Sequence, residues 1–128
     1  MKIRISSLRN INSFRKFLNT KYKKDICFII NKYEKTKTEI KHLYLNKIQV
    51  KLEKRRLGYG TNFMTDLCAY ADFLQLPIKL YPMPLGDEIK KMRLNRFYKK
   101  FGFEFVGKDH EMMRKCESKK TFLYTKLT

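Results

Sequence analysis

The sequence predicts an α/β domain in which a mixed central sheet carries helices on both of its faces. Runs of β-branched and aromatic residues with period-two alternation occupy residues 26–30 and 39–52, as expected of strands. Apolar residues at three- and four-residue spacing follow from Thr61, as in an amphipathic helix. A short strand at residues 78–81 comes directly after Pro77, so strand, helix and strand follow one another as in a βαβ unit.

The N-terminal part of the chain is expected to form a short strand, a helix and a second strand. Ser6 and Ser7 are both suitable N-cap residues for this helix, which is expected to end near Asn19. Its apolar side chains recur at helical spacing and are Leu8, Ile11, Phe14 and Leu18. The strand at residues 26–30 and the segment 39–52 are expected to pair as antiparallel neighbours, because only a short polar connection separates them.

Side chains of the segment 39–52 should alternate between the two faces of its strand. One face carries Leu43, Leu45 and Lys47. The other carries His42, Tyr44, Asn46, Ile48 and Val50. Because both faces carry apolar groups, we expect a central strand that is covered on both sides.

Two further helices are predicted in the second half of the chain. The first has Thr61 as a suitable N-cap, ends before Pro77, and presents an apolar stripe of Met64, Leu67, Cys68, Ala71 and Leu74. The second spans about residues 88–101, and Gly102 suits its C-terminal cap. One side of it carries Leu94, Phe97, Tyr98 and Phe101. A strand is predicted to follow at residues 103–106.

The chain has the length and composition of one compact domain, which we expect to span residues 1–128. Its 43% apolar and 14% aromatic residues are enough for a packed core and argue against disorder. Three cysteines without a C-x-x-C pair indicate neither a disulfide framework nor a metal site. No stretch approaches the roughly 20 apolar residues of a membrane span. We therefore expect a cytoplasmic protein that binds no metal and no membrane.

The net charge of +18 predicts a strongly positive surface, since 30 lysines and arginines face only 12 acidic residues. Such a surface attracts phosphate groups, whether in nucleic acid, in lipid headgroups or in a phosphorylated cofactor. Compositional bias towards lysine, asparagine and isoleucine produces the same excess. The charge alone therefore identifies no partner.

A glycine-containing turn with the sequence RRLGYGT occupies residues 55–61, between the long strand and the following helix. Gly58 and Gly60 allow a sharp turn and a close approach of backbone N–H groups to an anion, and the helix adds its positive N-terminal end. The segment lacks the ending of a Walker loop and the third glycine of a dinucleotide-binding motif. It is therefore either a pyrophosphate cradle of another kind or an ordinary turn.

Two segments together resemble the GNAT superfamily of N-acetyltransferases. The sequence IQV at residues 48–50, followed by RRLGYG at 55–60, is similar to the family's R/Q-x-x-G-x-G/A acetyl-CoA motif. The sequence LNRFYKKFGF at 94–103 resembles its second cofactor segment, in which an asparagine precedes a Phe/Leu-Tyr pair and a Gly-Phe pair. The two segments occur in the family's order, roughly forty residues apart, which is more specific than either alone. The resemblance covers about residues 39–115 and only loosely residues 1–38.

The resemblance implies a GNAT fold, in which acetyl-CoA wedges between two neighbouring parallel strands that splay apart. These strands would be residues 44–52 and 77–81. Backbone amides near 49–52 would contact the pantetheine arm and thioester carbonyl, amides of 55–61 the pyrophosphate, and Asn95 the pantetheine arm. The implied cofactor-binding residues are Ile48, Gln49, Val50, Arg55, Arg56, Leu57, Gly58, Tyr59, Gly60, Thr61, Asn95 and Tyr98.

The resemblance also implies a general acid but leaves the general base unassigned. Tyr98 matches the residue that often protonates the CoA thiolate, although its helical position equally suits packing. Several family members place a glutamate on the strand before the glycine turn, where this chain has Tyr44. His42, two residues earlier, is a second candidate for a base or a water relay. Glu39 is the nearest carboxylate, and a chain of water molecules is a further route.

The predicted function is transfer of an acetyl group from acetyl-CoA to a primary amine, by direct attack in a ternary complex. A +18 chain repels polycations unless an acidic cleft compensates, and the acidic residues show no cluster in the sequence. We therefore expect an acceptor amine on an anionic molecule. The alternative is a non-catalytic GNAT-fold protein that uses its basic surface, including the run Lys90–Lys100, on nucleic acid or another anionic partner. We expect a monomer or a homodimer.

Overall fold

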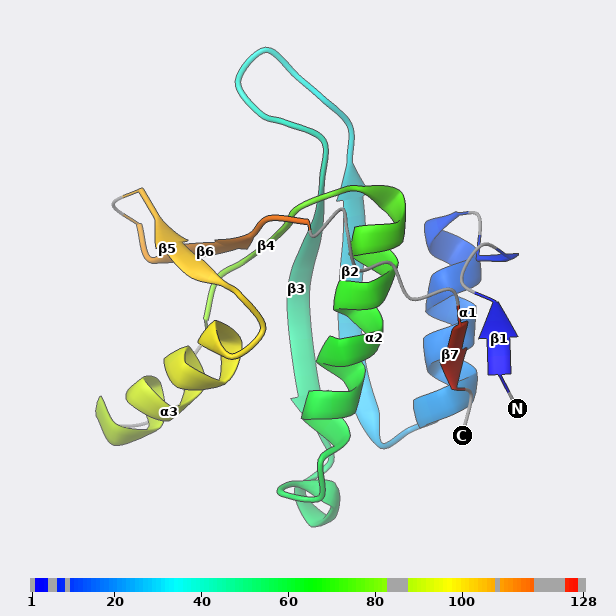
Figure 1. The fold of residues 1–128 in the computed structure, drawn as a ribbon. Coiled ribbons are helices and arrows are strands. Elements are labelled where there is room, and N and C mark those ends of the chain that lie inside the picture. Colours follow the sequence, from blue (N-terminus) through cyan, green and yellow to red (C-terminus); the bar gives the residue numbers. More distant parts are fainter. Residues whose placement is uncertain are drawn as a thin grey trace.

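The computed structural model describes residues 2–4, 7–8, 10–82, 88–107, 109–116 and 124–126. The elements in chain order (Figure 1) are β1 (Lys2–Arg4), α1 (Ile11–Tyr22), β2 (Ile26–Tyr33), β3 (His42–Val50), the 3-10 helix η2 (Leu52–Lys54), α2 (Tyr59–Leu74), β4 (Ile78–Leu80), α3 (Glu88–Lys99), β5 (Glu104–Val106), β6 (Glu111–Arg114) and β7 (Tyr124–Lys126). Five strands form one sheet in the order β2-β3-β4-β6-β5, and β1 pairs with β7. Within the larger sheet β3 and β4 are parallel, whereas the other neighbouring strands are antiparallel. The predicted α/β class with a mixed sheet and flanking helices is confirmed.

Helices α1 and α2 lie side by side over one face of the sheet (Figure 1). Aromatic contacts join them, because the rings of Phe14 and Tyr70 stack with centroids 4.0 Å apart and those of Tyr22 and Phe63 are 5.8 Å apart. The apolar spacing that predicted the helices also predicts which side chains they bury, namely Phe14 and Leu18 in α1 and Met64, Leu67, Cys68 and Ala71 in α2. Within the described part of the chain, no helix combines the length and apolar character needed to cross a membrane.

Helix α1 begins and ends later than the sequence predicts. Its N-cap is Asn10, whose side chain accepts a hydrogen bond from the backbone of Ser13 at 2.9 Å. Asparagine is as good an N-cap as serine, and the expected cap Ser7 lies three residues earlier, while Ser6 lies outside the described residues. The helix continues to Tyr22, whose ring is buried in the core, so its last turn also packs against the core.

A β-bulge interrupts the pairing of β2 with β3. Ile29 pairs with Lys47 but the next residue, Ile30, pairs with Leu45, so Asn46 has no partner across the ladder. An extra residue of this kind bends its strand and reverses the alternation of side chains beyond it.

The bulge brings apolar residues from both halves of β3 to the same core. Leu43 and Leu45 are buried towards the helices, and Ile48 and Val50 pack against the same cluster. Regular alternation would have placed these two pairs on opposite faces, which is why the sequence predicted a strand with two apolar faces. The opposite face near the bulge instead carries exposed side chains such as Lys47.

Strands β3 and β4 are paired over only part of their length. The parallel register runs from Leu43 opposite Ile78 to Leu45 opposite Leu80, where β4 ends. Strand β3 continues past the bulge to Val50 and extends away from β4 (Figure 1). The expected splaying of two neighbouring parallel strands is therefore present, and it begins at the bulge.

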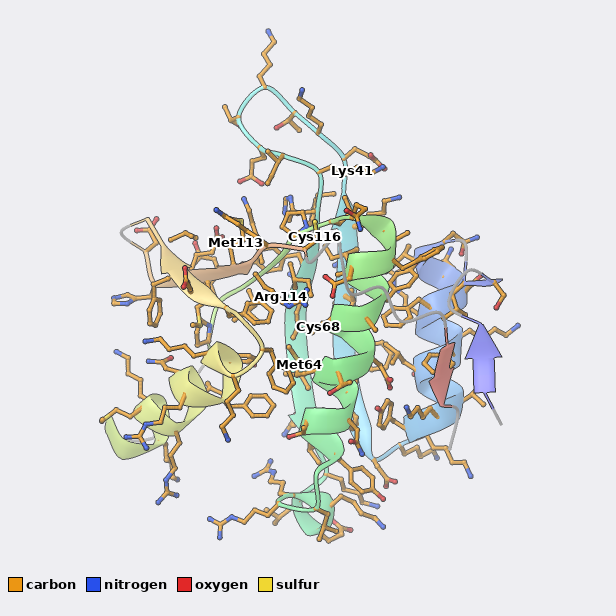
Figure 2. The ribbon with its side chains drawn as sticks, in the orientation of Figure 1. Lys41, Met64, Cys68, Met113, Arg114 and Cys116 are labelled. Carbon is orange, nitrogen blue, oxygen red and sulfur yellow. The ribbon has the colours of Figure 1, made fainter. Side chains whose placement is uncertain are left out.

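A buried ion pair joins α2, α3 and β6. Arg114 of β6 points towards α2 (Figure 2), where its two terminal nitrogens donate to the carboxylate of Asp72 at 2.8 and 3.0 Å. Its Nε donates to the carbonyl oxygen of Phe101 at 2.8 Å. Gly102, with a φ of 93°, closes the end of α3 as predicted, since its N–H donates to the Lys99 carbonyl at 3.0 Å. The Arg114 side chain thus links β6 both to α2 and to the turn that follows α3.

Candidate functional site

The turn between β3 and α2 adopts a left-handed backbone at two positions. Arg56 has a φ of 65° and Gly58 a φ of 85°. A Cβ atom on Gly58 would meet nothing within 4 Å, so backbone handedness and not crowding favours glycine there. Helix α2 begins at the next residue, with Gly58 as its N-cap in place of the expected Thr61. The left-handed turn allows this earlier start, and it places Gly60 within the first helical turn.

The electrostatic character of this turn suits an anion. The first turn of α2 contains no acidic residue, and no side chain caps it, so its amides keep the unsatisfied N–H groups of a helix start. Arg55 and Arg56 are exposed beside it, as is Leu57. The Nε of Arg55 donates to the carbonyl oxygen of Val50 at 3.0 Å, which holds the start of the turn against the end of β3. The residues present therefore fit a phosphate-bearing cofactor.

The two motif segments meet at Gly60. A Cβ atom built on this glycine would lie 3.5 Å from Cζ of Phe97 and 3.8 Å from Cγ2 of Val50. The end of β3, the first turn of α2 and the side of α3 therefore come together at one place. The sequence placed Gly60 and Phe97 in separate motifs, and the fold makes them neighbours at the end of β3, beyond the stretch that pairs with β4.

Tyr98 is buried next to this junction. It is 5% exposed, and its ring lies 5.4 Å from that of Phe97 and 5.9 Å from that of Phe103. Burial raises the pKa of Tyr98 to about 12, so its hydroxyl keeps its proton at neutral pH. No described residue forms a hydrogen bond with this hydroxyl. Asn95, one turn earlier in α3, is half-buried.

A pocket of about 210 Å³ lies at the other half of β3, on the face that points away from α1 and α2. The residues that line it are Tyr33, Glu39, His42, Tyr44, Asn46 and Glu111. It contains both residues that the sequence offered as candidates for a base, His42 and Tyr44. Asn46, the bulge residue, belongs to its wall, so the pocket adjoins the point where β3 and β4 part.

His42 is buried in the wall of this pocket with one ring nitrogen engaged. Its Nδ1 lies 2.7 Å from the carbonyl oxygen of Ile40, and a carbonyl can only accept, so Nδ1 carries the hydrogen. In the neutral ring Nε2 is then the acceptor, and it lies 3.7 Å from a carboxylate oxygen of Glu39. The geometry leaves Nε2 available to accept a proton.

Tyr44 is half-buried and surrounded by other rings. Its centroid lies 6.2 Å from that of Tyr33, 6.2 Å from His42 and 6.4 Å from Tyr81. Burial, followed by the negative charge of Glu111, raises the pKa of Tyr44 to about 12. The phenol is therefore protonated at neutral pH, which favours a role as hydrogen-bond donor over a role as base.

The structure brings together two carboxylates that the sequence keeps far apart. Lys79 of β4 lies between them, with its Nζ 3.6 Å from Oε2 of Glu39 and 4.0 Å from Oε1 of Glu111. The expectation that acidic residues form no cluster is therefore wrong for this pair. Only the parallel pairing of β3 with β4 and the antiparallel pairing of β4 with β6 place them at one end of the sheet. No local sequence pattern signals such a meeting.

The chain matches no protein-family model and no curated protein. Among solved structures it is similar to the anti-CRISPR protein AcrVA5, with a TM-score of 0.48 and 22% identity over 66% of this chain and 96% of that chain. It is also similar to AtaTR bound with acetyl-CoA, with a TM-score of 0.48 and 12% identity over 69% of this chain and 55% of that chain. A mutant AtaT toxin bound to the C-terminus of the antitoxin AtaR and acetyl-CoA gives a TM-score of 0.42 and 12% identity, over 70% and 55%.

The chain thus spans about half the length of the two AtaT chains and nearly all of AcrVA5. At these identities and TM-scores the likeness concerns the fold alone. The resemblance of the chain to the GNAT superfamily consists of its two motif segments and of the mixed sheet with its parted parallel strands.

Proposed function

We propose that the chain is an acetyltransferase of the GNAT type, which transfers an acetyl group from acetyl-CoA to a primary amine in a ternary complex. The observation that carries this proposal is the junction at Gly60, where both motif segments meet beside the parted strands. Acetyl-CoA is also the molecule bound in AtaTR, one of the solved structures to which the chain is similar.

The chain offers two surfaces to an extended cofactor with a diphosphate. The turn of residues 55–61 presents helix-start amides and the exposed cations of Arg55 and Arg56. Beyond Leu45, β3 has no described strand beside it on the β4 side, so its backbone there forms no ladder with a described strand on that side. We propose that Ile48, Gln49 and Val50 use this edge for the pantetheine arm. When bound, acetyl-CoA supplies the acetyl group as an activated thioester.

Tyr98 is the proposed proton donor at the sulfur. Because its pKa is about 12, the phenol carries its hydrogen on the oxygen at neutral pH. It is a weaker acid than an ordinary thiol of pKa near 8.5, so it donates a hydrogen bond first and gives up its proton only as negative charge develops. The neighbouring rings of Phe97 and Phe103 pack against the phenol ring and hold it in place.

The experiment that tests the proposed function measures acetyl-CoA binding by calorimetry and CoA release with a thiol reagent. We expect binding without any acceptor, a slow release of CoA from hydrolysis, and a faster release when an amine is added. Mass spectrometry of the amine should show its acetylated form. Absence of acetyl-CoA binding to the folded chain would contradict the proposal.

A second candidate function follows from the exposed basic residues of α3, Lys90, Arg93, Arg96 and Lys99, together with Lys100 directly after it. We propose binding to nucleic acid through phosphate contacts as the alternative. Such binding should be largely independent of sequence and should weaken steeply as salt is raised. Fluorescence anisotropy with unrelated duplexes at low salt measures it, and no binding there would remove this candidate.

A further inference from the structure

The pocket on the outer face of β3 has the chemistry of a site for a cationic amine. Resting on the proposed function, we propose that it binds the acceptor as an aliphatic primary ammonium group, with Glu39 and Glu111 matching its charge. This acceptor class is the opposite of the anionic carrier that net charge alone predicts. Four features of the pocket support it: its local charge, its rings, its position and its size.

Carboxylates outnumber lysine ammonium groups at the pocket, although the chain carries +18. The titratable groups that line or adjoin it are Tyr33, Glu39, His42, Tyr44, Lys79, Tyr81 and Glu111. Two carboxylates, those of Glu39 and Glu111, face one lysine ammonium, that of Lys79. Burial is the largest cause that raises the pKa of Tyr44, and the charges of Glu111 and, least of all, Glu39 add to it, as negative charge beside a phenol does.

Glu39 is held in place by the loop that carries it. The backbone N–H of Glu39 donates to the hydroxyl of Thr36 at 3.0 Å, and the N–H of Thr36 donates to the Glu39 carbonyl at 2.9 Å. The carboxylate is therefore presented by a closed turn, and Glu111 faces it from the start of β6. A cation that enters the pocket would meet both carboxylates, which Lys79 already bridges.

Aromatic rings form the remaining wall. Tyr33 stacks on His42 with centroids 5.3 Å apart, and it meets Tyr44 edge-on at 6.2 Å. Tyr33, which lines the pocket, is 46% exposed, and Tyr81, whose ring lies near that of Tyr44, is 42% exposed. Tyrosine faces attract ammonium groups and also pack against methylene chains, which suits an alkylammonium group better than a carboxylate or a phosphate.

The position of the pocket suits an acceptor whose nitrogen must reach the opening between β3 and β4. Asn46 and Tyr44 line the pocket and flank the point where the parallel pairing ends. His42, in the wall, has Nε2 free of hydrogen bonds to described residues. An amine bound here lies beside a proton acceptor, and the turn at Gly58 lies at the far end of the same strand.

The proton balance of the transfer follows from these groups. The ammonium group loses one proton to Nε2 of His42, which passes it to solvent. The nitrogen then forms a bond to the acetyl carbon while the carbon–sulfur bond breaks. Tyr98 gives its proton to the departing sulfur and regains one from the nitrogen, so that an amide, a thiol and one released proton result.

The size of the pocket limits what can enter it. At about 210 Å³ it is smaller than the roughly 300–1,000 Å³ of sites that enclose drug-sized ligands. A slender alkyl chain fits, and the rest of the acceptor must stay outside. Two sources supply this chemistry, a small free alkylamine and a lysine side chain of a peptide.

The experiment compares acceptors of matched length with acetyl-CoA at saturation. We expect higher kcat/KM for cadaverine and for a neutral lysine-containing peptide than for aminohexanoate, whose far end is anionic. Activity with cadaverine but not the peptide assigns the free amine, and the converse assigns the side chain. Faster acetylation of aminohexanoate than of both cadaverine and the peptide would overturn the proposal.

Two charge-neutral variants and a matched control make the test specific. Glu39→Gln and Glu111→Gln should each raise KM for the cationic acceptor about tenfold, the size of ~1.4 kcal/mol, with acetyl-CoA affinity unchanged. Glu104→Gln, on the exposed surface of β5, removes the same charge and should leave KM unaltered. An unchanged KM in both pocket variants would refute the role of the carboxylates.

A binding measurement separates this proposal from the proposed function. Saturation-transfer NMR of cadaverine with the protein alone should give a signal that Glu111→Gln weakens and Glu104→Gln leaves intact. If acetyl-CoA binds but cadaverine gives no signal, the pocket proposal fails and the acetyltransferase proposal stands. If cadaverine binds through Glu111 and acetyl-CoA does not bind, the pocket stands and the acetyltransferase proposal fails.

Discussion

The two halves of β3 belong to one strand but differ in almost every property. The half from His42 to Leu45 is paired with β2 throughout and with β4 from Leu43, and it lies among tyrosines, a buried histidine and two carboxylates. The half from Lys47 to Val50 loses its neighbour on the β4 side and leads into a basic turn with two glycines. Asn46 separates them. A single unpaired residue can thus divide one strand into a region suited to a cation and a region suited to an anion.

The largest effect is expected for Tyr98→Phe, which tests whether the two halves cooperate at one reacting centre. The variant keeps the ring that packs on Phe97 and Phe103 and removes only the hydroxyl. Loss of a positioned proton donor should slow turnover by roughly 100- to 10,000-fold, or about 3 to 5 kcal/mol of barrier. Steady-state kinetics measure it, and calorimetry should show unchanged acetyl-CoA affinity. Turnover as fast as the parent would make Tyr98 a packing residue.

The next effect is expected at the basic half, from Gly60→Glu. A carboxylate in the first turn of α2 would fill the junction at Phe97 and repel a diphosphate, so acetyl-CoA affinity should fall by about 100-fold or more, ~3 kcal/mol. Gly60→Ala is the matched control, because its Cβ would make only ordinary contacts of 3.5 and 3.8 Å. Calorimetry measures the acetyl-CoA affinity of both folded variants. Equal affinities would mean that the diphosphate binds elsewhere.

Unfolding at alkaline pH should reveal that the Tyr98 phenol is buried in the folded chain. The pKa of Tyr98 is raised from 10.0 to about 12, so between these values the folded chain holds a proton that the unfolded chain has lost. The contribution to stability is complete below pH 10 and is lost as pH rises through 12, by about 2 to 3 kcal/mol. Urea unfolding at pH 9 to 12 should therefore show a smaller loss in Tyr98→Phe than in the parent. An equal loss in both proteins would contradict burial of this phenol.

The pKa of Tyr44 can be compared with that of Tyr98 over the same alkaline pH range. Its pKa of about 12 is raised partly by the charge of Glu111, whereas burial alone raises that of Tyr98. Ultraviolet titration of Glu111→Gln should consequently show a lower pKa for Tyr44, and also for Tyr81, than in the parent. If no phenol moves, Glu111 exerts no negative potential on this half of the strand.

The smallest effect is expected from deletion of Asn46, which removes the β-bulge that separates the two halves of β3. The remaining sequence alternates regularly with Leu45 and Ile48 on the core side, so the fold should persist while β3 straightens. We expect acetyl-CoA affinity to fall about tenfold, ~1.4 kcal/mol, as the opening towards β4 narrows. Deletion of both Asn46 and Lys47 is the control, since it turns Ile48 and Val50 outward and should unfold the chain. Thermal melting with calorimetry checks both, and full affinity in the single deletion would contradict the role of the bulge.

Local sequence features were sufficient to predict most of the elements. The apolar spacing of Met64, Leu67 and Cys68 predicts the buried side of α2, and Gly102 predicts the end of α3, because both depend on neighbours within a few residues. The parted strands were expected only through the resemblance of the glycine turn to a known motif. The roles of Tyr98, His42 and the turn residues remain predictions.

The features that escaped prediction depend on contacts between distant residues. The bulge at Asn46 is set by the register with β2, and alternation in β3 alone could not reveal it. Glu39 and Glu111 meet only through the order of strands in the sheet. The early start of α2 at Tyr59 depends on a left-handed Gly58, which competes with the more familiar cap Thr61.

The ion pair of Arg114 and Asp72 has a consequence for how this sequence can diverge. Arg114 reaches a carboxylate with two nitrogens and a backbone carbonyl with a third, all from one planar group. Lysine carries a single ammonium and cannot meet both partners, so even the most conservative replacement of the cation leaves a polar group stranded in the interior. Among homologues, the many exposed lysines should therefore vary freely, whereas arginine at this position and aspartate at its partner should be inherited together.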